Sequence, residues 1–257
     1  MNKVCMGLAI MVMISACKKN SPAMSGGDRN TNPRTVTQLS FSGYTWNVKS
    51  SGTSTAGPGP NYWNSNNVWV DANGYLHLKL SYDSAAGHWD CAEVWSDSSF
   101  GYGTYQWWVE GRVDTLDKNV VLGLFNYSGN DGYDEMDIEF SRWGVSTNPI
   151  LNYTVYPATG SKGKTAWQST SNFTMTGGTY STHRFTRNHA DSVVFKGLYG
   201  FYNDDTNLFK KATCAPPKSI STLSMPVHMN LWLFQGMTPS NGQNVEIIIH
   251  SFTYTAI

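Results

Sequence analysis

The segment Gly132–Phe140 carries the side chains best suited to chemistry. It reads GYDEMDIEF, so acidic and apolar residues alternate along it. In a β-strand successive side chains point to opposite sides, which would place Glu135, Asp137 and Glu139 on one face. The other face would consist of Met136, Ile138 and Phe140. The pattern therefore predicts a strand with its apolar face against a core and its acidic face toward solvent or a cleft.

Three carboxylates in succession, with no basic residue between them, repel one another. This repulsion raises the pKa of at least one of them, as a general acid at neutral pH requires. Hydrolysis of a glycosidic bond uses two such carboxyl groups, and a separation of about 5–5.5 Å gives retention of configuration. Glu135 and Glu139 would be about 13 Å apart at Cα in an extended strand, so their side chains would have to lean together over a curved strand.

Two other interpretations of the acidic face remain open on spacing alone. It could be a solvated strand face. It could also be a Ca²⁺ site, although such a site needs six to eight oxygen ligands, which usually come from loops rather than from one strand face.

The elements that would hold this strand are short and alternate with period two. Leu76, Leu78 and Leu80 fall on one face of Tyr75–Leu80, and Val245–Tyr254 is rich in β-branched and aromatic residues. We expect a further strand pair within Asp191–Tyr202 and a single helical turn near Ser219–Leu223. Turn signals separate such runs at 71–74, 130–132, 157–160 and 240–242. Short strands at regular spacing predict an all-β fold, a β-jelly-roll sandwich of two antiparallel sheets with a concave substrate cleft.

The composition excludes several functional classes. The 257 residues hold 18 Lys+Arg and 18 Asp+Glu, so the formal net charge is zero and a basic nucleic-acid footprint is absent. Only 14% of residues are charged, against about 25% in typical domains, while 14% are aromatic. No apolar run approaches the roughly 18 residues of a membrane-spanning helix. A surface of this kind suits an uncharged partner such as a sugar.

The N-terminal residues are predicted to be a targeting signal rather than part of the folded domain. After Lys3, the stretch Val4–Ile14 is apolar and has the length of a signal peptide core. The following Ser-Ala-Cys resembles the lipobox of bacterial lipoproteins, and Lys18 after the cysteine favours outer-membrane retention. We therefore expect a lipoprotein signal peptide over 1–16, a flexible tether over 17–36 that is lipidated at Cys17, and one folded domain over 37–257. The alternative is an ordinary secretory signal in which the cysteine occurs by chance.

Two cysteines, Cys91 and Cys214, lie outside the N-terminal targeting segment. In an oxidising compartment they could form a disulfide, but the sequence does not give the Cα separation that a disulfide needs. Pairing and two free buried thiols therefore both stay open.

Several blocks of the sequence together resemble glycoside hydrolase family 16. The acidic segment is similar to the active-site strand of its bacterial lichenases (endo-1,3-1,4-β-glucanases) and plant xyloglucan transglycosylases, with the acids spaced Glu-x-Asp-x-Glu. The other similar blocks occur in the same order as in the lichenases: Gly74–Leu78, Asp90–Ser96, Tyr102–Tyr105 and Met229–Trp232. The resemblance extends from about Asn61 to Trp232, which is nearly the whole expected domain.

The resemblance implies a role for each matching residue. Glu135 would be the nucleophile, Glu139 the acid and then the base, and Asp137 the helper between them. Glu93 would accept hydrogen bonds from sugar hydroxyls. The other residues that match substrate-binding positions of the lichenases are Tyr127, Tyr133, Tyr156, Asn230 and Trp232.

The chain also departs from the lichenase pattern. Trp95 stands where the lichenases carry a sugar-contacting Arg, and Arg187 stands where a Trp is usual. The lichenase partner of Cys91 is missing around Asn61–Asn64. None of these departures touches the three acids, but they leave the exact polysaccharide open.

Three functions are therefore in competition. The first is a retaining endo-acting hydrolase of β-1,3-1,4-glucan or a related β-linked polysaccharide, with laminarin, xyloglucan or a galactan as other substrates and transglycosylation as a close variant. The second is a surface glycan-binding lipoprotein without activity, and the third is an adhesion or structural sandwich. The predicted chemistry requires no cofactor and no metal ligands are assigned; a structural Ca²⁺ is allowed but not indicated. We expect a monomer in the cell envelope, anchored to the outer membrane and facing the periplasm or the surface, whose partners are a polysaccharide and the lipid anchor.

Overall fold

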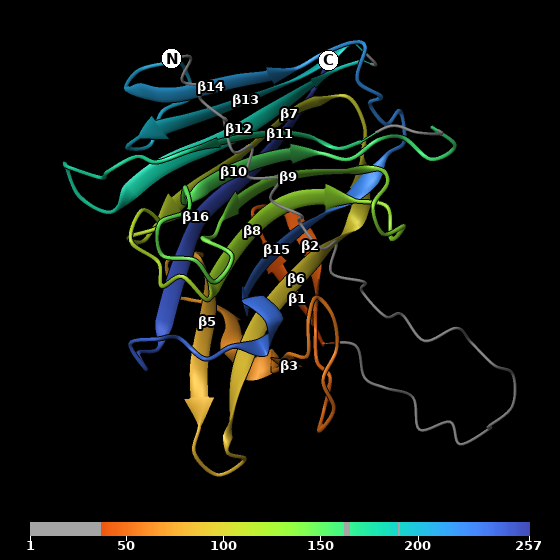
Figure 1. The fold of residues 1–257 in the computed structure, drawn as a ribbon. Coiled ribbons are helices and arrows are strands. Elements are labelled where there is room, and N and C mark those ends of the chain that lie inside the picture. The colour runs from red at the N-terminus through yellow and green to blue at the C-terminus, as the bar shows by residue number, and fades with distance from the viewer. Residues whose placement is uncertain (1–36, 162–164, 190) are drawn as a thin grey trace, which may run out of the picture.

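The computed structural model describes residues 37–161, 165–189 and 191–257, and these form a two-layered β-structure (Figure 1). The predicted signal peptide, the tether and Cys17 lie outside the described residues. Among the described residues, no helix has the length and apolar character needed to cross a membrane. The all-β prediction is confirmed.

The first layer contains eight strands in the spatial order β11-β10-β9-β8-β15-β6-β2-β1. Neighbouring strands in this layer are antiparallel. The bounds are β1 Thr37–Phe41, β2 Tyr44–Val48, β6 His88–Phe100, β8 Val120–Tyr127, β9 Glu135–Phe140, β10 Leu151–Val155, β11 Trp167–Ser171 and β15 Met225–Leu233.

The second layer runs in the order β14-β13-β12-β7-β16-β5-β4. Its bounds are β4 Val68–Val70, β5 Leu76–Asp83, β7 Gly103–Glu110, β12 Tyr180–Asn188, β13 Ser192–Tyr199, β14 Leu208–Cys214 and β16 Val245–Ala256. The end of β5 pairs with the start of β6, and this hairpin joins the two layers. β3 (Tyr62–Trp63) adds a short parallel pair to β6. Two 3₁₀ turns, η1 Ser65–Asn67 and η2 Phe234–Gly236, complete the elements.

Aromatic side chains fill the space between the layers. The ring of Tyr153 on β10 stacks on Phe195 of β13 with centroids 4.7 Å apart, and Phe140 on β9 meets His183 of β12 edge-on at the same distance. The predicted alternation on β5 is present, because Leu76, Leu78 and Leu80 are fully buried. The apolar face of the acidic strand therefore packs into this core, and its acidic face points the other way.

The buried side chain of Arg187 binds the segment Ser219–Leu223, for which the sequence predicted a helical turn. No helical turn forms at Ser219–Leu223. Instead, Arg187 on β12 is fully buried and donates hydrogen bonds to the carbonyls of Ser221 (3.0 Å) and Leu223 (2.8 Å) and to the Asn126 side chain (3.0 Å). The extended segment satisfies the guanidinium with carbonyl oxygens that a helix would have used internally.

The predicted strand pair within Asp191–Tyr202 is also wrong. This region holds one strand, β13, and its partner β14 starts only at Leu208, after a loop over 200–207. Glycine at position 200, with a φ of +79°, ends the strand rather than forming a tight hairpin.

Both remaining cysteines are free thiols buried in the structure. The Cys91 sulfur lies 3.5 Å from the side-chain oxygen of Asn61, in the region where the lichenase partner is missing. Burial raises the pKa of the Cys91 thiol to about 12 and that of Cys214 to about 11. Of the two open alternatives, the structure shows two free buried thiols.

Candidate active site

The acidic strand begins at a residue with an uncommon backbone conformation. Asp134 has a φ of +51°, in the left-handed region that Asp enters more readily than most side chains. Its carboxylate accepts hydrogen bonds from the amide (3.1 Å) and the hydroxyl of Thr159, and its own amide donates to the carbonyl of Pro157 (2.9 Å). These contacts fix the point at which β9 starts, so that Glu135 is its first residue.

Glu135, Asp137 and Glu139, hereafter the acid triad, share the face of β9 that points away from the core. The residues between them belong to the buried core, as the alternation predicted. Glu135 and Asp137 are only 8% and 4% exposed, so neighbouring side chains shield them from bulk water. The structure therefore brings three carboxyl groups together on one partly shielded surface, hereafter the acid face, of the first layer.

Strand register sets the nearest neighbours of the acid triad. On β8, Tyr127 lies opposite Glu135, Phe125 opposite Asp137 and Gly123 opposite Glu139. On β10, Thr154 lies opposite Asp137 and Asn152 opposite Glu139. The triad is thus flanked on one side by rings and on the other by small polar side chains.

Two of the predicted tyrosines face the triad closely enough to feel its charge. Burial raises the pKa of the Tyr156 hydroxyl, and Asp137, Glu139 and Glu135 raise it further. Burial also raises the pKa of Tyr127, together with Asp131, which accepts a hydrogen bond from its hydroxyl, and Glu135. The backbone amide of Tyr156 donates to the Glu135 carbonyl at 2.9 Å. Tyr133, by contrast, lies in the loop before β9 and is 38% exposed.

β15 brings Asn230 and Trp232 to the same layer. Asn230 lies between Gly123 of β8 and Glu93 of β6 in the register. A Cβ atom at position 123 would lie 2.5 Å from the Asn230 side-chain oxygen, so glycine is required for this close approach. That oxygen is buried and, among the described residues, makes no hydrogen bond. Trp232 packs against Trp143, with ring centroids 6.5 Å apart.

Glu93 lies between two cationic or titratable groups that sequence reasoning missed. Lys49 Nζ is 2.6 Å from one carboxylate oxygen of Glu93, and His228 Nδ1 is 3.2 Å from the other. Burial alone would raise the pKa of Glu93, but Lys49 and His228 outweigh it and lower the pKa to about 2. Glu93 is therefore an ionised hydrogen-bond acceptor at neutral pH.

His228 also belongs to a row of rings across the first layer. Its ring stacks on Phe125 (4.9 Å) and lies nearly parallel to Trp95 (6.4 Å). The sequence signal for His228 was available, since it stands two residues before Asn230 on the same strand and so shares its face. Lys49 carried no such signal, because only the fold brings it to Glu93, 44 residues further along the chain.

No group of three or more His, Cys, Asp or Glu side chains in the described ranges is arranged to hold a metal ion. The residues around the acid triad are instead aromatic rings, an amide and a hydroxyl, such as Tyr127, Tyr156, Asn152 and Thr154. These groups stack on sugar rings and exchange hydrogen bonds with sugar hydroxyls.

No protein-family model matches the sequence. The chain is 36% identical over 103 residues to a β-glucanase of Paenibacillus macerans, which is 39% of this chain and 41% of that protein. It is 36% identical over 81 residues to a β-glucanase of Bacillus subtilis strain 168, covering 30% of this chain and 32% of that protein. The chain thus matches about two fifths or less of the length of these relatives.

The fold is shared much more widely. The Bacillus licheniformis β-glucanase superposes with a TM-score of 0.60 at 24% identity, covering 82% of this chain and 92% of that one. A glycoside hydrolase family 16 endo-glucanase from Bacteroides ovatus superposes with a TM-score of 0.58 at 13% identity, covering 82% and 94%. These comparisons confirm the jelly-roll prediction and the predicted resemblance to the lichenase-like β-glucanases of family 16.

Proposed function

We propose that this protein is a retaining endo-acting glycoside hydrolase that cleaves a β-linked glucan of the β-1,3-1,4 or a related type. The observation that carries the proposal is the acid triad: three carboxyl groups on one face of β9, opposite the core and flanked by Tyr127 and Tyr156. Three mutually repelling acids cost stability, and their concentration on one surface is typical of a catalytic site.

In the proposed mechanism, a Glu135 carboxylate oxygen attacks the anomeric carbon while Glu139 donates its proton to the departing glycosidic oxygen. The glycosidic C–O bond breaks and a covalent glycosyl ester forms on Glu135. Glu139, now ionised, takes a proton from a water molecule, which attacks the same carbon and releases Glu135. Two inversions give net retention.

Asp137 lies between Glu135 and Glu139 on the same face of β9. Its role in the proposal is to hold a hydrogen bond or proton as negative charge moves from Glu135 to the ester and back. Because the triad shares its face with Tyr156, whose hydroxyl pKa is raised, that tyrosine stays protonated and is able to donate to a sugar oxygen.

The substrate proposal follows from the rest of the acid face. Phe125, His228 and Trp95 form a row of stacked rings across this face, while ionised Glu93 and the Asn230 amide carry acceptors for hydroxyl groups. A neutral polysaccharide needs this combination and needs no cationic groove. We also propose that the protein is anchored by a lipid in the cell envelope, as its N-terminal sequence predicts, and that it meets its substrate outside the cytoplasm.

The test is release of reducing ends from a panel of barley β-glucan, laminarin, xyloglucan, agarose and carrageenan. We expect release from barley β-glucan, and near-total loss in Glu135→Gln with little change in thermal stability. Glu246→Gln, which removes an exposed carboxylate from β16 in the second layer, is the matched control and should retain the activity. No release from any polysaccharide, together with retained binding, would overturn the enzyme proposal in favour of a glycan-binding protein.

A further inference from the structure

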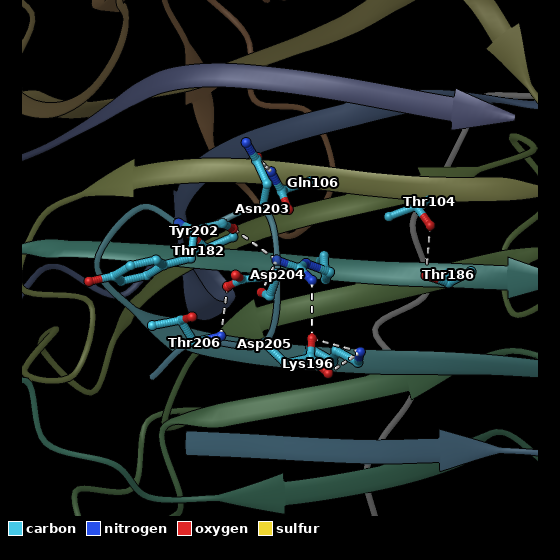
Figure 2. A network of polar contacts seen from close by, with 11 residues as sticks. Thr104, Gln106, Thr182, Thr186, Lys196, Tyr202, Asn203, Asp204, Asp205 and Thr206 are labelled. Carbon is cyan, nitrogen blue, oxygen red and sulfur yellow. Dashed lines mark hydrogen bonds and ion pairs between the residues drawn. The ribbon is translucent and has the colours of Figure 1, made fainter. Parts of the chain in front are cut away.

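The loop 200–207 lies over part of the outer face of the second layer, which is opposite the acid face. Arg184 on β12 fastens this loop. Its guanidinium is almost fully buried and donates to the carbonyls of Tyr202 (2.9 Å) and Asp204 (2.8 Å) and to the Asp205 carboxylate (3.2 Å). Lys196 on β13 reaches Asp205 from the neighbouring strand at 2.7 Å (Figure 2).

Two further contacts fasten the same loop to the sheet. Gln106 on β7 donates to the side chain of Asn203 at 2.9 Å, and Thr182 on β12 accepts from the Tyr202 amide at 3.0 Å (Figure 2). The Thr182 hydroxyl also donates to the Gly200 carbonyl at 2.8 Å. Three strands therefore hold one loop in a single position over the sheet.

The fixed loop carries a ring into an aromatic cluster. Phe201 stacks flat on Trp108 of β7, with centroids 5.1 Å apart and planes 4° from parallel, and on Tyr180 of β12 at 4.7 Å. His250 of β16 lies 4.9 Å from Phe201 and 3.9 Å from Tyr75. We call these five residues the aromatic platform.

The platform stays open to solvent in spite of its contacts. Tyr180 is 48% exposed, and the other four residues are half-buried. The imidazole of His250 has a polar partner, since its Nε2 lies 2.6 Å from a carboxylate oxygen of Glu110. Covering the platform would therefore remove apolar ring surface from water without leaving a charge unpaired.

A pocket of about 220 Å³ adjoins the platform at Tyr180. Its walls include the rings of Tyr180, Tyr199 and Tyr202, and part of its floor is made by Gly177 and Gly178, which carry no side chain. A Cβ atom at position 177 would meet nothing within 4 Å, so the glycine there leaves open space. Within the described part of the chain, none of the three tyrosine hydroxyls makes a hydrogen bond.

We propose that the platform and this pocket form a second binding site for a neutral polysaccharide chain. Rings held flat and half-exposed bind the apolar faces of sugar residues, and tyrosine hydroxyls serve the sugar hydroxyls. A nucleic acid would need cations, but Arg184 and Lys196 at this face are already paired with Asp205. That the chain is a β-glucan, the same class as the substrate, rests on the proposed function.

The position of the site sets its use. The platform and the acid triad lie on the outer faces of different layers, so a segment bound at the platform is not the segment being cleaved. The site would keep the protein on a polymer while the acid face acts on another stretch of it, which raises the effective substrate concentration.

The experiment uses affinity electrophoresis of the Glu135→Gln protein in native gels that contain barley β-glucan, laminarin or xyloglucan. We expect Tyr180→Ala in this background to weaken the retardation by at least one glucan by about three- to tenfold. Tyr82→Ala is the matched control, because it removes another ring that is 51% exposed, on β5 and away from the platform. It should leave the retardation unchanged.

A second variant fills the pocket without removing any contact. Gly177→Leu adds a side chain into open space and should weaken retardation as Tyr180→Ala does, with thermal stability measured for both. Equal retardation in all variants would overturn the proposal. It would also be overturned if the variants changed the oligomeric state and left glycan binding unchanged, since the platform would then be a protein interface. Retardation that depends on Tyr180 in a protein that hydrolyses no glucan would refute the proposed function and leave this site standing.

Discussion

The two outer faces of the sandwich distribute charge in opposite ways. On the second layer, Arg184 and Lys196 share Asp205, so opposite charges are close neighbours, and His250 is hydrogen-bonded to Glu110. On the first layer, three carboxyl groups follow one another along β9, while Lys49 and the His228 ring contact Glu93. Paired charges fasten loops, whereas concentrated like charges weaken a fold and are retained where chemistry needs them.

The largest effect that would test this contrast is on the rate of cleavage. Glu139→Gln should slow hydrolysis of the polysaccharide by at least about 10³-fold, because the departing oxygen loses its proton donor. An aryl glycoside with a good leaving group should lose much less in the first step, since that leaving group needs no proton. Pre-steady-state and steady-state rates on both substrates provide the measurement. An equal loss on the two substrates would contradict the acid role of Glu139.

The same substitution should leave the fold intact. A glutamine has nearly the shape of the protonated acid and brings no negative charge to Glu135 and Asp137, so the thermal midpoint of Glu139→Gln should stay level or rise. A fall of many degrees would show that the acid face serves stability after all.

The second layer should respond in the opposite sense. Arg184→Met removes the donor for two loop carbonyls and for Asp205, and should lower the free energy of unfolding by about 2–3 kcal/mol. Thermal and urea unfolding measure this loss. A loss below about 0.5 kcal/mol would mean that the contacts of Arg184 do not stabilise the loop 200–207. The paired charges of the second layer would then contribute no more to stability than the acid triad does.

Glu93 should show an intermediate behaviour, because its charge is paired yet lies on the acid face. Its pKa in the folded protein, about 2, is below the ordinary 4.5, so its ionised form stabilises the fold above pH 4.5 and this contribution is lost as the pH falls toward 2. Glu93→Gln should therefore lower stability at pH 7 by on the order of 2 kcal/mol. It should also flatten the decline of stability between pH 4.5 and 2. An unchanged slope in that window would show that Lys49 and His228 do not hold the charge.

Local pattern was enough to predict the acid strand. Alternation of acids with Met136, Ile138 and Phe140 fixes both faces of β9, and the same rule holds for the leucines of β5. It would also have placed His228 beside Asn230. These inferences succeed because a strand has a strict period of two and because one side of it must be buried.

Contacts between distant segments were beyond that rule. Lys49 reaches Glu93 only through the pairing of β2 with β6, and Arg187 holds Ser221 and Leu223 only because β12 lies across the core from them. The sequence around Gly197 and Gly200 predicts a strand pair within Asp191–Tyr202, but the loop 200–207 follows β13 there instead. Its conformation is decided by Arg184, which no local pattern connects to it.

Covalent trapping shows which side chain attacks the sugar, and so tests the proposed role of Glu135 as the nucleophile. A 2-fluoro β-glucan oligosaccharide with a good leaving group slows the release of the glycosyl ester, so the intermediate accumulates and can be located by peptide mass spectrometry. We expect one added glycosyl group on Glu135, and none in Glu135→Gln. A group attached to Glu139, Asp137 or Glu93, or turnover of the reagent with inversion at the anomeric carbon, would contradict it.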